Sequence, residues 1–189
     1  MKHAQTIEII RKLKAKKVKF EHGLSDEEVQ QIENKFNLKF PPDLLYFLQK
    51  ELPVSNDFVN WRSGLKSKSE AIAIRKKLDW PFDGMVFDIE KNGFWIEEWG
   101  TKSDNVSENI ATAKRHYKTY PKMIPIRSHR YIPSKPYKAA NPVFSIYQTD
   151  IIYYGYDLAH YLANEFHFEL SNDFIKLDKP RHIKFWGDF

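Results

Sequence analysis

The chain of 189 residues contains no cysteine, only seven glycines and no long apolar run. Without cysteine it cannot form a disulfide, a thiolate zinc site, an iron–sulfur cluster or a thiol nucleophile. Its few glycines form no phosphate-cradling loop, dinucleotide-binding fingerprint or nucleophile elbow. No apolar stretch reaches about 18 residues, and the basic N-terminus lacks the apolar core of a secretory signal. We therefore expect a soluble, cytoplasmic protein without a cofactor.

The histidines give no metal-ligand pattern. They are scattered at positions 3, 22, 116, 129, 160, 167 and 182. No HExxH or H-x3-H spacing occurs, and although His160 and His167 could share a helix face, no third ligand is evident, so we predict no metal site. His129-Arg130-Tyr131 is the best isolated polar triplet, because it can donate to an anion and stack. Such a triplet more often anchors a loop to a sheet.

Composition favours one packed domain that begins with a charged helix. Hydrophobic residues make up 42% and aromatic residues 15% of the chain, which is ample for a core. The net charge is +5, but residues 1–19 hold seven basic side chains against Glu8 alone; that segment carries +6 and the remainder −1. We expect a basic N-terminal helix at 1–19, a domain at 20–178 and a packed C-terminal tail at 179–189. The basic helix is either a solvated face or an electrostatic arm for nucleic acid or a membrane surface.

The clearest local signal predicts a pair of helices between residues 24 and 48. Ser25 at the N-cap and Glu28 three residues later form a capping box. Three apolar residues at helical spacing then give one buried face: Val29, Ile32 and Phe36. Asn37 can end this helix in a left-handed conformation, and Pro42 suits the first turn of the next helix.

After a loop, the hydrophobic pattern changes its period. A short helix is predicted at 71–78, with Pro81 terminating it. Residues 85–96 then alternate around an Asn92-Gly93 turn, which predicts a β-hairpin.

The predicted hairpin carries the main acidic cluster of the chain. On a strand, Asp88 and Glu90 would point to one face. Two acids and two tryptophans lie close by: Glu97, Glu98, Trp95 and Trp99. Three interpretations stay open, namely a solvent-facing strand, an acid–base pair of an enzyme, and a surface that binds a partner.

Residues 141–166 form the predicted nucleus of the fold. Two strand-forming pieces, 143–146 and 151–154, are joined by a polar turn that contains Asp150. Asp157 can then cap a helix with an apolar face made of Leu158, Tyr161, Leu162 and Phe166. Asp150 is either a hydrogen-bond partner of its own turn or the general base of an unknown site.

Two stretches in this order resemble the SUKH superfamily, the fold of the Smi/Knr-type cell-wall assembly regulators. QTDIIYYG followed by a DLxxYL helix, at 148–162, resembles one part of that family. LSDEEVQQIE and PPDLLYF, at 24–33 and 41–47, resemble its N-terminal helices. The resemblance covers roughly residues 24–166. It implies a single α+β domain, in which N-terminal helices pack on a mainly antiparallel sheet and a further helix closes it.

The same resemblance implies a binding protein without catalytic residues. Many bacterial SUKH proteins neutralise a cognate polymorphic toxin, often a nuclease, while fungal members look like scaffolding regulators of wall synthesis. We therefore expect an immunity protein whose partner is a toxin domain, and neither a membrane nor nucleic acid as partner. The alternatives are binding of nucleic acid or an anionic surface by the basic helix, a wall-synthesis scaffold, and an enzyme. The basic net charge counts against a simple acidic mimic of a nuclease substrate.

The predicted contact surface combines acids for steering, tryptophans as anchors and one cation as an ion-pair donor. Its residues are Asp88, Glu90, Glu97, Glu98, Trp95, Trp99 and Arg130.

Overall fold

The computed structural model of the chain describes residues 3–55, 57–174 and 177–189. Helices surround a small and a larger antiparallel sheet, which confirms the predicted α+β class. The elements follow in the order α1 (His3–Ala15), β1 (Phe20–His22), α2 (Asp26–Phe36), α3 (Pro42–Lys50), β2 (Glu51–Pro53), α4 (Ser63–Lys66), α5 (Lys68–Lys91), the 3-10 helix η1 (Glu97–Trp99), α6 (Val106–Tyr117), β3 (Met123–Arg127), β4 (Arg130–Pro133), β5 (Val143–Tyr147), β6 (Asp150–Gly155) and α7 (Leu158–Phe166).

The larger sheet is a meander of antiparallel strands in the order β3-β4-β5-β6. In the pairing of β5 with β6, Ser145 lies opposite Ile152 and Ile146 opposite Ile151. Successive side chains of a strand point to opposite faces. Ile132 accordingly enters one apolar cluster and Tyr131 another, and both are almost fully buried. Both faces of the sheet are therefore covered.

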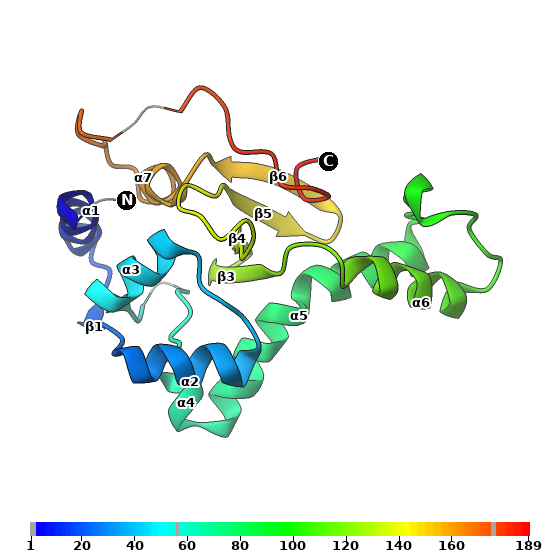
Figure 1. Cartoon of the computed structure of the whole chain (residues 1–189), viewed down its shortest axis with the longest axis horizontal. Helices are drawn as coiled ribbons and strands as arrows, with labels where there is room; N and C mark the ends of the chain where they lie inside the picture. Colours follow the sequence, from blue (N-terminus) through cyan, green and yellow to red (C-terminus); the bar gives the residue numbers. More distant parts are fainter. Residues whose placement is uncertain (1–2, 56, 175–176) are drawn as a thin grey trace.

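Helices from both ends of the chain cover one face. Residues of α1, α2, α3 and α7 form one cluster with Ile124, Ile132 and Val143 of the sheet. The helix α1 packs against α3 and α7, and α1 and α7 lie side by side at one edge of the molecule (Figure 1). Ile9 and Leu13 of α1 are 0% exposed. The basic N-terminal helix is therefore part of the core.

The other face is covered by α5, α6 and the C-terminal segment. Met85 and Ile89 of α5 join Phe144 of the sheet in the second cluster, together with Ile183 and Trp186. The Trp186 indole donates a hydrogen bond to a backbone carbonyl before β3 at 2.8 Å. In Figure 1, α5 runs past the sheet toward α6, and the C-terminal segment returns along β6. Residues 179–189 thus complete the core.

The predicted end of a helix at Pro81 and the predicted hairpin at 85–96 are wrong. One helix, α5, runs from Lys68 to Lys91 with Pro81 buried inside it. A proline in a helix lacks the N–H that would bond the carbonyl four residues earlier. Here that carbonyl belongs to Lys77, and it accepts a hydrogen bond of 2.8 Å from the Tyr131 hydroxyl instead. Asn92-Gly93, taken as a hairpin turn, ends the helix: Asn92 is its C-cap, and Gly93 follows with φ of +71°.

Asp150, predicted to lie in the polar turn, is instead the first residue of β6 and lies opposite Tyr147. The helix ends predicted at Ser25, Asn37 and Asp157 hold. Ser25 and Glu28 form the reciprocal capping box at the start of α2, and Asn37 ends that helix with φ of 49°. Asp157 caps α7, accepting the backbone N–H of His160. None of the helices in the described parts of the chain is long and apolar enough to cross a membrane.

Candidate functional site

The two tryptophans of the predicted contact surface stay together, but one of them is interior. The rings of Trp95 and Trp99 meet edge to face, with centroids 5.3 Å apart. Trp99 is only 5% exposed, and its indole N–H donates to the Tyr120 hydroxyl at 2.8 Å. That hydroxyl donates in turn to Glu98 at 3.0 Å. Glu97 and Glu98 remain exposed, so this loop presents acids beside a half-buried Trp95.

Asp88 is not a surface acid. It is 4% exposed, and its Oδ2 accepts hydrogen bonds from both the backbone N–H and the hydroxyl of Thr149. Burial alone would raise the pKa of Asp88, but the bonds from Thr149 and from Asn92 outweigh burial and hold it below its ordinary value. Glu90 is exposed on the same helix. Because a helix advances 100° per residue, the two carboxylates point to different faces, unlike on the predicted strand.

Arg130 points to another part of the sheet. Its guanidinium donates to Glu165 of α7 and, at 2.7 Å, to Ser145 of β5, and it stacks on the Tyr154 ring 3.7 Å from the centroid. Glu165 also pairs with Arg127. The predicted surface is therefore divided into four parts: a buried link at Asp88, the exposed Glu90 on another face of α5, the loop at 95–99 and the ion pairs around Arg130.

The structure brings together a different group of residues, in a half-open cavity between α5, the β3–β4 turn and the end of β5. The cavity has a volume of about 450 Å³ and is lined by Lys76, Lys77, Trp80, Ser128, His129, Tyr131 and Tyr147. Trp80 and Tyr147 are 43% and 56% exposed although their rings are in contact, with centroids 6.2 Å apart. His129 meets Tyr147 edge to face at 6.4 Å. We call this group the aromatic cavity.

Tight packing between α5 and the β5–β6 turn positions Tyr147. A Cβ atom added at Gly84 would come within 2.7 Å of the Gln148 Cα, so only glycine allows this approach. The bonds from Thr149 to Asp88 fix the same turn one helical turn further along α5. Tyr147 directly precedes the turn and is held against Trp80. These contacts fix the turn after Tyr147 to the helix that carries Trp80.

Sequence reasoning missed this site because it ended the helix before Pro81. With a continuous helix, Trp80, Gly84 and Asp88 recur every four residues and share one face. That periodicity was the available signal. The triplet His129-Arg130-Tyr131 did point to the right turn, and two of its members line the aromatic cavity.

The electrostatics of the aromatic cavity favour an apolar group next to a negative charge. Lys76 and Lys77 flank it, and within the described chain no carboxylate lines it. Burial, together with the charge of Arg130, lowers the pKa of His129 below its ordinary value. Ser128 and His129 lie within hydrogen-bond distance, Oγ to Nδ1 at 3.1 Å.

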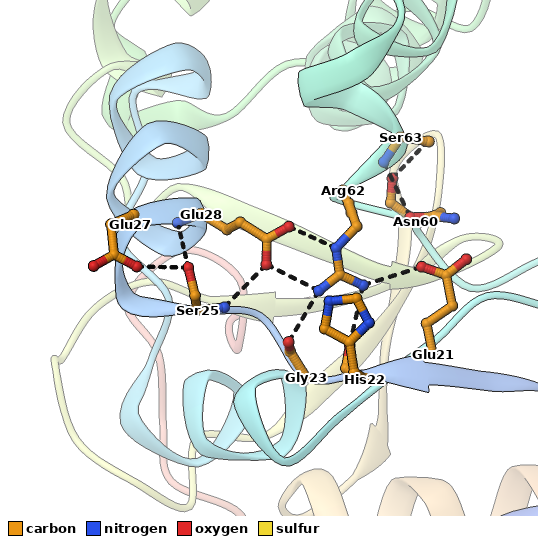
Figure 2. A network of polar contacts seen from close by, with 9 residues as sticks. All are labelled: Glu21, His22, Gly23, Ser25, Glu27, Glu28, Asn60, Arg62 and Ser63. Atoms are coloured by element: carbon orange, nitrogen blue, oxygen red, sulfur yellow. Dashed lines mark hydrogen bonds and ion pairs between the residues drawn. The ribbon is translucent and has the colours of Figure 1, made fainter.

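The densest polar network lies elsewhere and is structural (Figure 2). The Arg62 side chain is 3% exposed, and all five of its N–H donors are used. Two go to Glu28, one to Glu21 and two to the backbone carbonyls of His22 and Gly23. Arg62 thus ties the capping box of α2 to β1. With every donor used inside the fold, this network offers nothing to a ligand.

Within residues 3–55, 57–174 and 177–189, no three histidine or acidic side chains are placed to hold a metal ion. Comparisons with models of protein families, with curated proteins and with solved structures found no match. The resemblance to SUKH proteins therefore stays a prediction from sequence.

Proposed function

We propose that the chain is a non-catalytic protein-binding module that neutralises a cognate bacterial toxin domain as an immunity protein. The SUKH-like motifs at 24–47 and 148–162 support the immunity role. The observation that carries protein binding is the pair Trp80 and Tyr147, two large aromatic side chains left exposed on α5 and β5 beside a cavity. Aromatic residues in such pockets are the usual anchors of protein interfaces.

The chemistry of the aromatic cavity indicates how a partner would be recognised. An apolar side chain of the toxin domain fills the space beside Trp80 and Tyr147. Carboxylates around that side chain face Lys76 and Lys77, which steer the encounter and fix its orientation. This charge pattern reverses the acidic surface predicted from the sequence.

One observation supports a catalytic role for the aromatic cavity, namely the contact between Ser128 and His129. Nucleophilic catalysis by serine needs a third group that orients the histidine and donors that stabilise an oxyanion. In the described chain, the His129 ring has a hydrogen-bond contact with Ser128 and a ring contact with Tyr147. The carboxylate of Glu165 acts on this ring only through its charge and is paired with Arg127 and Arg130. The cavity therefore lends itself to binding more than to acyl transfer.

The test is a pull-down with tagged full-length protein from its native lysate, after nuclease treatment, with mass spectrometry of the retained proteins. We expect a protein with a toxin domain, whose toxicity on expression is relieved by co-expression of this chain. In a titration of the purified pair, Trp80→Ala/Tyr147→Ala should weaken binding by roughly 30-fold or more, the loss expected of two central anchors.

Two further variants make the result specific. Val106→Ala/Tyr156→Ala removes exposed apolar side chains that do not line the aromatic cavity, and it should bind like the wild type. Glu97→Gln/Glu98→Gln tests the acidic loop. If that variant loses the toxin while the aromatic variant keeps it, the binding surface is wrong although the function stands. If the chain relieves no toxicity of any retained protein, the immunity proposal fails.

The basic helix α1 supplies the competing function, binding of nucleic acid or an anionic surface. Lys12 and Lys14 are paired with Glu8 and Glu51, but Arg11 of the helix is exposed, as are three lysines that follow the helix: Lys16, Lys17 and Lys19. Deleting the helix would remove the buried Ile9 and Leu13 and unfold the chain, so the four exposed cations should be changed to glutamine instead. Toxin neutralisation should survive that change, whereas nucleic-acid retention, which weakens steeply with salt, should not.

A further inference from the structure

A second hollow on the molecule gathers lysines that are far apart in the sequence. It has a volume of about 510 Å³, is half open, and includes Lys39, Lys118, Lys122 and Lys135 in its lining. We propose that this hollow, the lysine hollow, binds the phosphate groups of a small ligand that carries at least two negative charges, such as a diphosphate or a nucleotide. It is separate from the aromatic cavity, and the proposal does not rest on the proposed function.

Three connections of the fold supply the four cations, because Lys118 and Lys122 both lie between α6 and β3. Lys39 lies between α2 and α3, Lys118 is the C-cap of α6, Lys122 precedes β3 and Lys135 follows β4. Counting charges along the sequence places the basicity in the first helix. Folding creates this second concentration of positive charge, which no single segment displays.

Lys122 has a local explanation, because its ammonium donates to the carbonyls of Phe36 and Asn37 at 3.0 and 2.8 Å. A cation at the C-terminus of α2 is stabilised by the helix dipole. These bonds use two of the three N–H donors of Lys122 and leave one for a ligand. Burial lowers the pKa of Lys122, so a bound anion would also relieve the cost of burying its charge.

Within the described chain, the charges of the other three lysines are not compensated by carbonyl acceptors in the way that the charge of Lys122 is. Among the described residues, no salt bridge joins Lys39, Lys118 or Lys135 to a carboxylate, and no acidic residue lines the lysine hollow. Like charges gathered in a concave surface repel each other and raise the local concentration of anions. A multivalent anion removes this repulsion, whereas a single carboxylate neutralises only part of it. The charge pattern therefore favours a ligand that carries phosphate groups.

Tyr137 stands at the rim and bears on the kind of phosphate ligand. It is 48% exposed, and the ammonium of Lys39 lies 4.7 Å from its ring centroid. An exposed ring next to lysines can stack with a base while the lysines hold the phosphates. The volume of the hollow falls within the range of small-molecule sites, roughly 300–1,000 Å³.

The test is a titration of the full chain at low salt, by calorimetry and by amide NMR shifts, with sodium pyrophosphate and with adenosine triphosphate as separate probes. We expect saturable binding that weakens with added sodium chloride and shifts amides around Lys118 and Lys135. The variant Lys118→Gln/Lys135→Gln should bind at least tenfold more weakly. Tighter binding of the nucleotide that is lost in Tyr137→Ala identifies the base as part of the ligand; equal binding of both probes identifies the phosphates alone.

The control is Lys76→Gln/Lys77→Gln, which removes the same charge from the rim of the aromatic cavity. It should bind both probes like the wild type. If both double variants weaken binding of the probes equally, binding depends on the net charge of the protein and not on the lysine hollow, and the proposal is overturned. So would amide shifts that map away from the lysine hollow, or binding only of a long single-stranded RNA and of neither small probe.

Discussion

One oxygen of Asp88 accepts two hydrogen bonds from Thr149, from its backbone N–H at 2.8 Å and from its hydroxyl at 2.7 Å. The two residues are 61 positions apart, so the pair joins α5 to the β5–β6 turn across the second core. Tyr147 lies just before that turn and packs on Trp80. The buried carboxylate therefore supports one wall of the aromatic cavity.

Removing this link should destabilise the fold. Asp88→Ala removes the acceptor of two donors on the half-buried Thr149, and we expect a loss of about 2–4 kcal/mol in the free energy of unfolding. The matched control is Glu90→Ala, an exposed acid on the same helix, which should cost less than about 0.5 kcal/mol. Urea denaturation measures both. Equal losses in the two variants would mean that the pair with Thr149 contributes little.

The hydroxyl of Tyr131 should be coupled to Pro81. Tyr131→Phe leaves the Lys77 carbonyl without its partner and should cost about 1–2 kcal/mol. Pro81→Ala restores the N–H that can bond this carbonyl within the helix. In the Pro81→Ala background, the loss caused by Tyr131→Phe should therefore be clearly smaller, as a double-mutant cycle in urea denaturation would show. Additive losses would disprove this account of how α5 passes through the proline.

These two long-range bonds also explain which parts of the fold could be predicted. The capping box of Ser25 and Glu28 and the unit at 141–166 rest on neighbours in the sequence, and both were predicted correctly. The continuity of α5 rests on Tyr131, which lies 54 residues beyond Lys77, so local rules ended the helix too early. The same error placed Asp88 on a strand, and it hid the aromatic cavity, whose walls come from three separate segments.

The imidazole of His129 should titrate below its ordinary value of about 6.5. Burial is the main cause, and the neighbouring charge of Arg130 adds to it. Because the unfolded chain takes up this proton first, lowering the pH through 6.5 toward the folded pKa should lower the free energy of unfolding. A titration of the histidine ring signals by NMR, with His129→Gln to assign the resonance, measures the pKa. A midpoint at or above 6.5 would contradict the burial of this ring.

The pair of Glu28 and Arg62 should make the fold sensitive to acid. Hydrogen bonds from Arg62 lower the pKa of Glu28 to about 2. The unfolded chain takes up the proton near the ordinary carboxyl value of 4.5, while the folded chain resists it. The stabilisation, roughly 3 kcal/mol at most, is therefore complete above about pH 5 and is lost as the pH falls toward 2.

Two glutamines separate this effect from general loss of charge. Glu28→Gln should cost about 3–5 kcal/mol at pH 7, because the buried Arg62 then keeps only Glu21 as an acidic partner. Its stability should also change less than that of the wild type between pH 5 and 2. Glu27→Gln removes a carboxylate from the same turn, but Glu27 bonds Ser25 and leaves Arg62 untouched. The hydrogen bond from Ser25 lowers the pKa of Glu27 as well, so this variant should lose a small part of the acid dependence of the wild type in urea denaturation and keep the part that arises at Glu28. If Glu28→Gln keeps the acid dependence of the wild type, the acid sensitivity arises at another carboxylate.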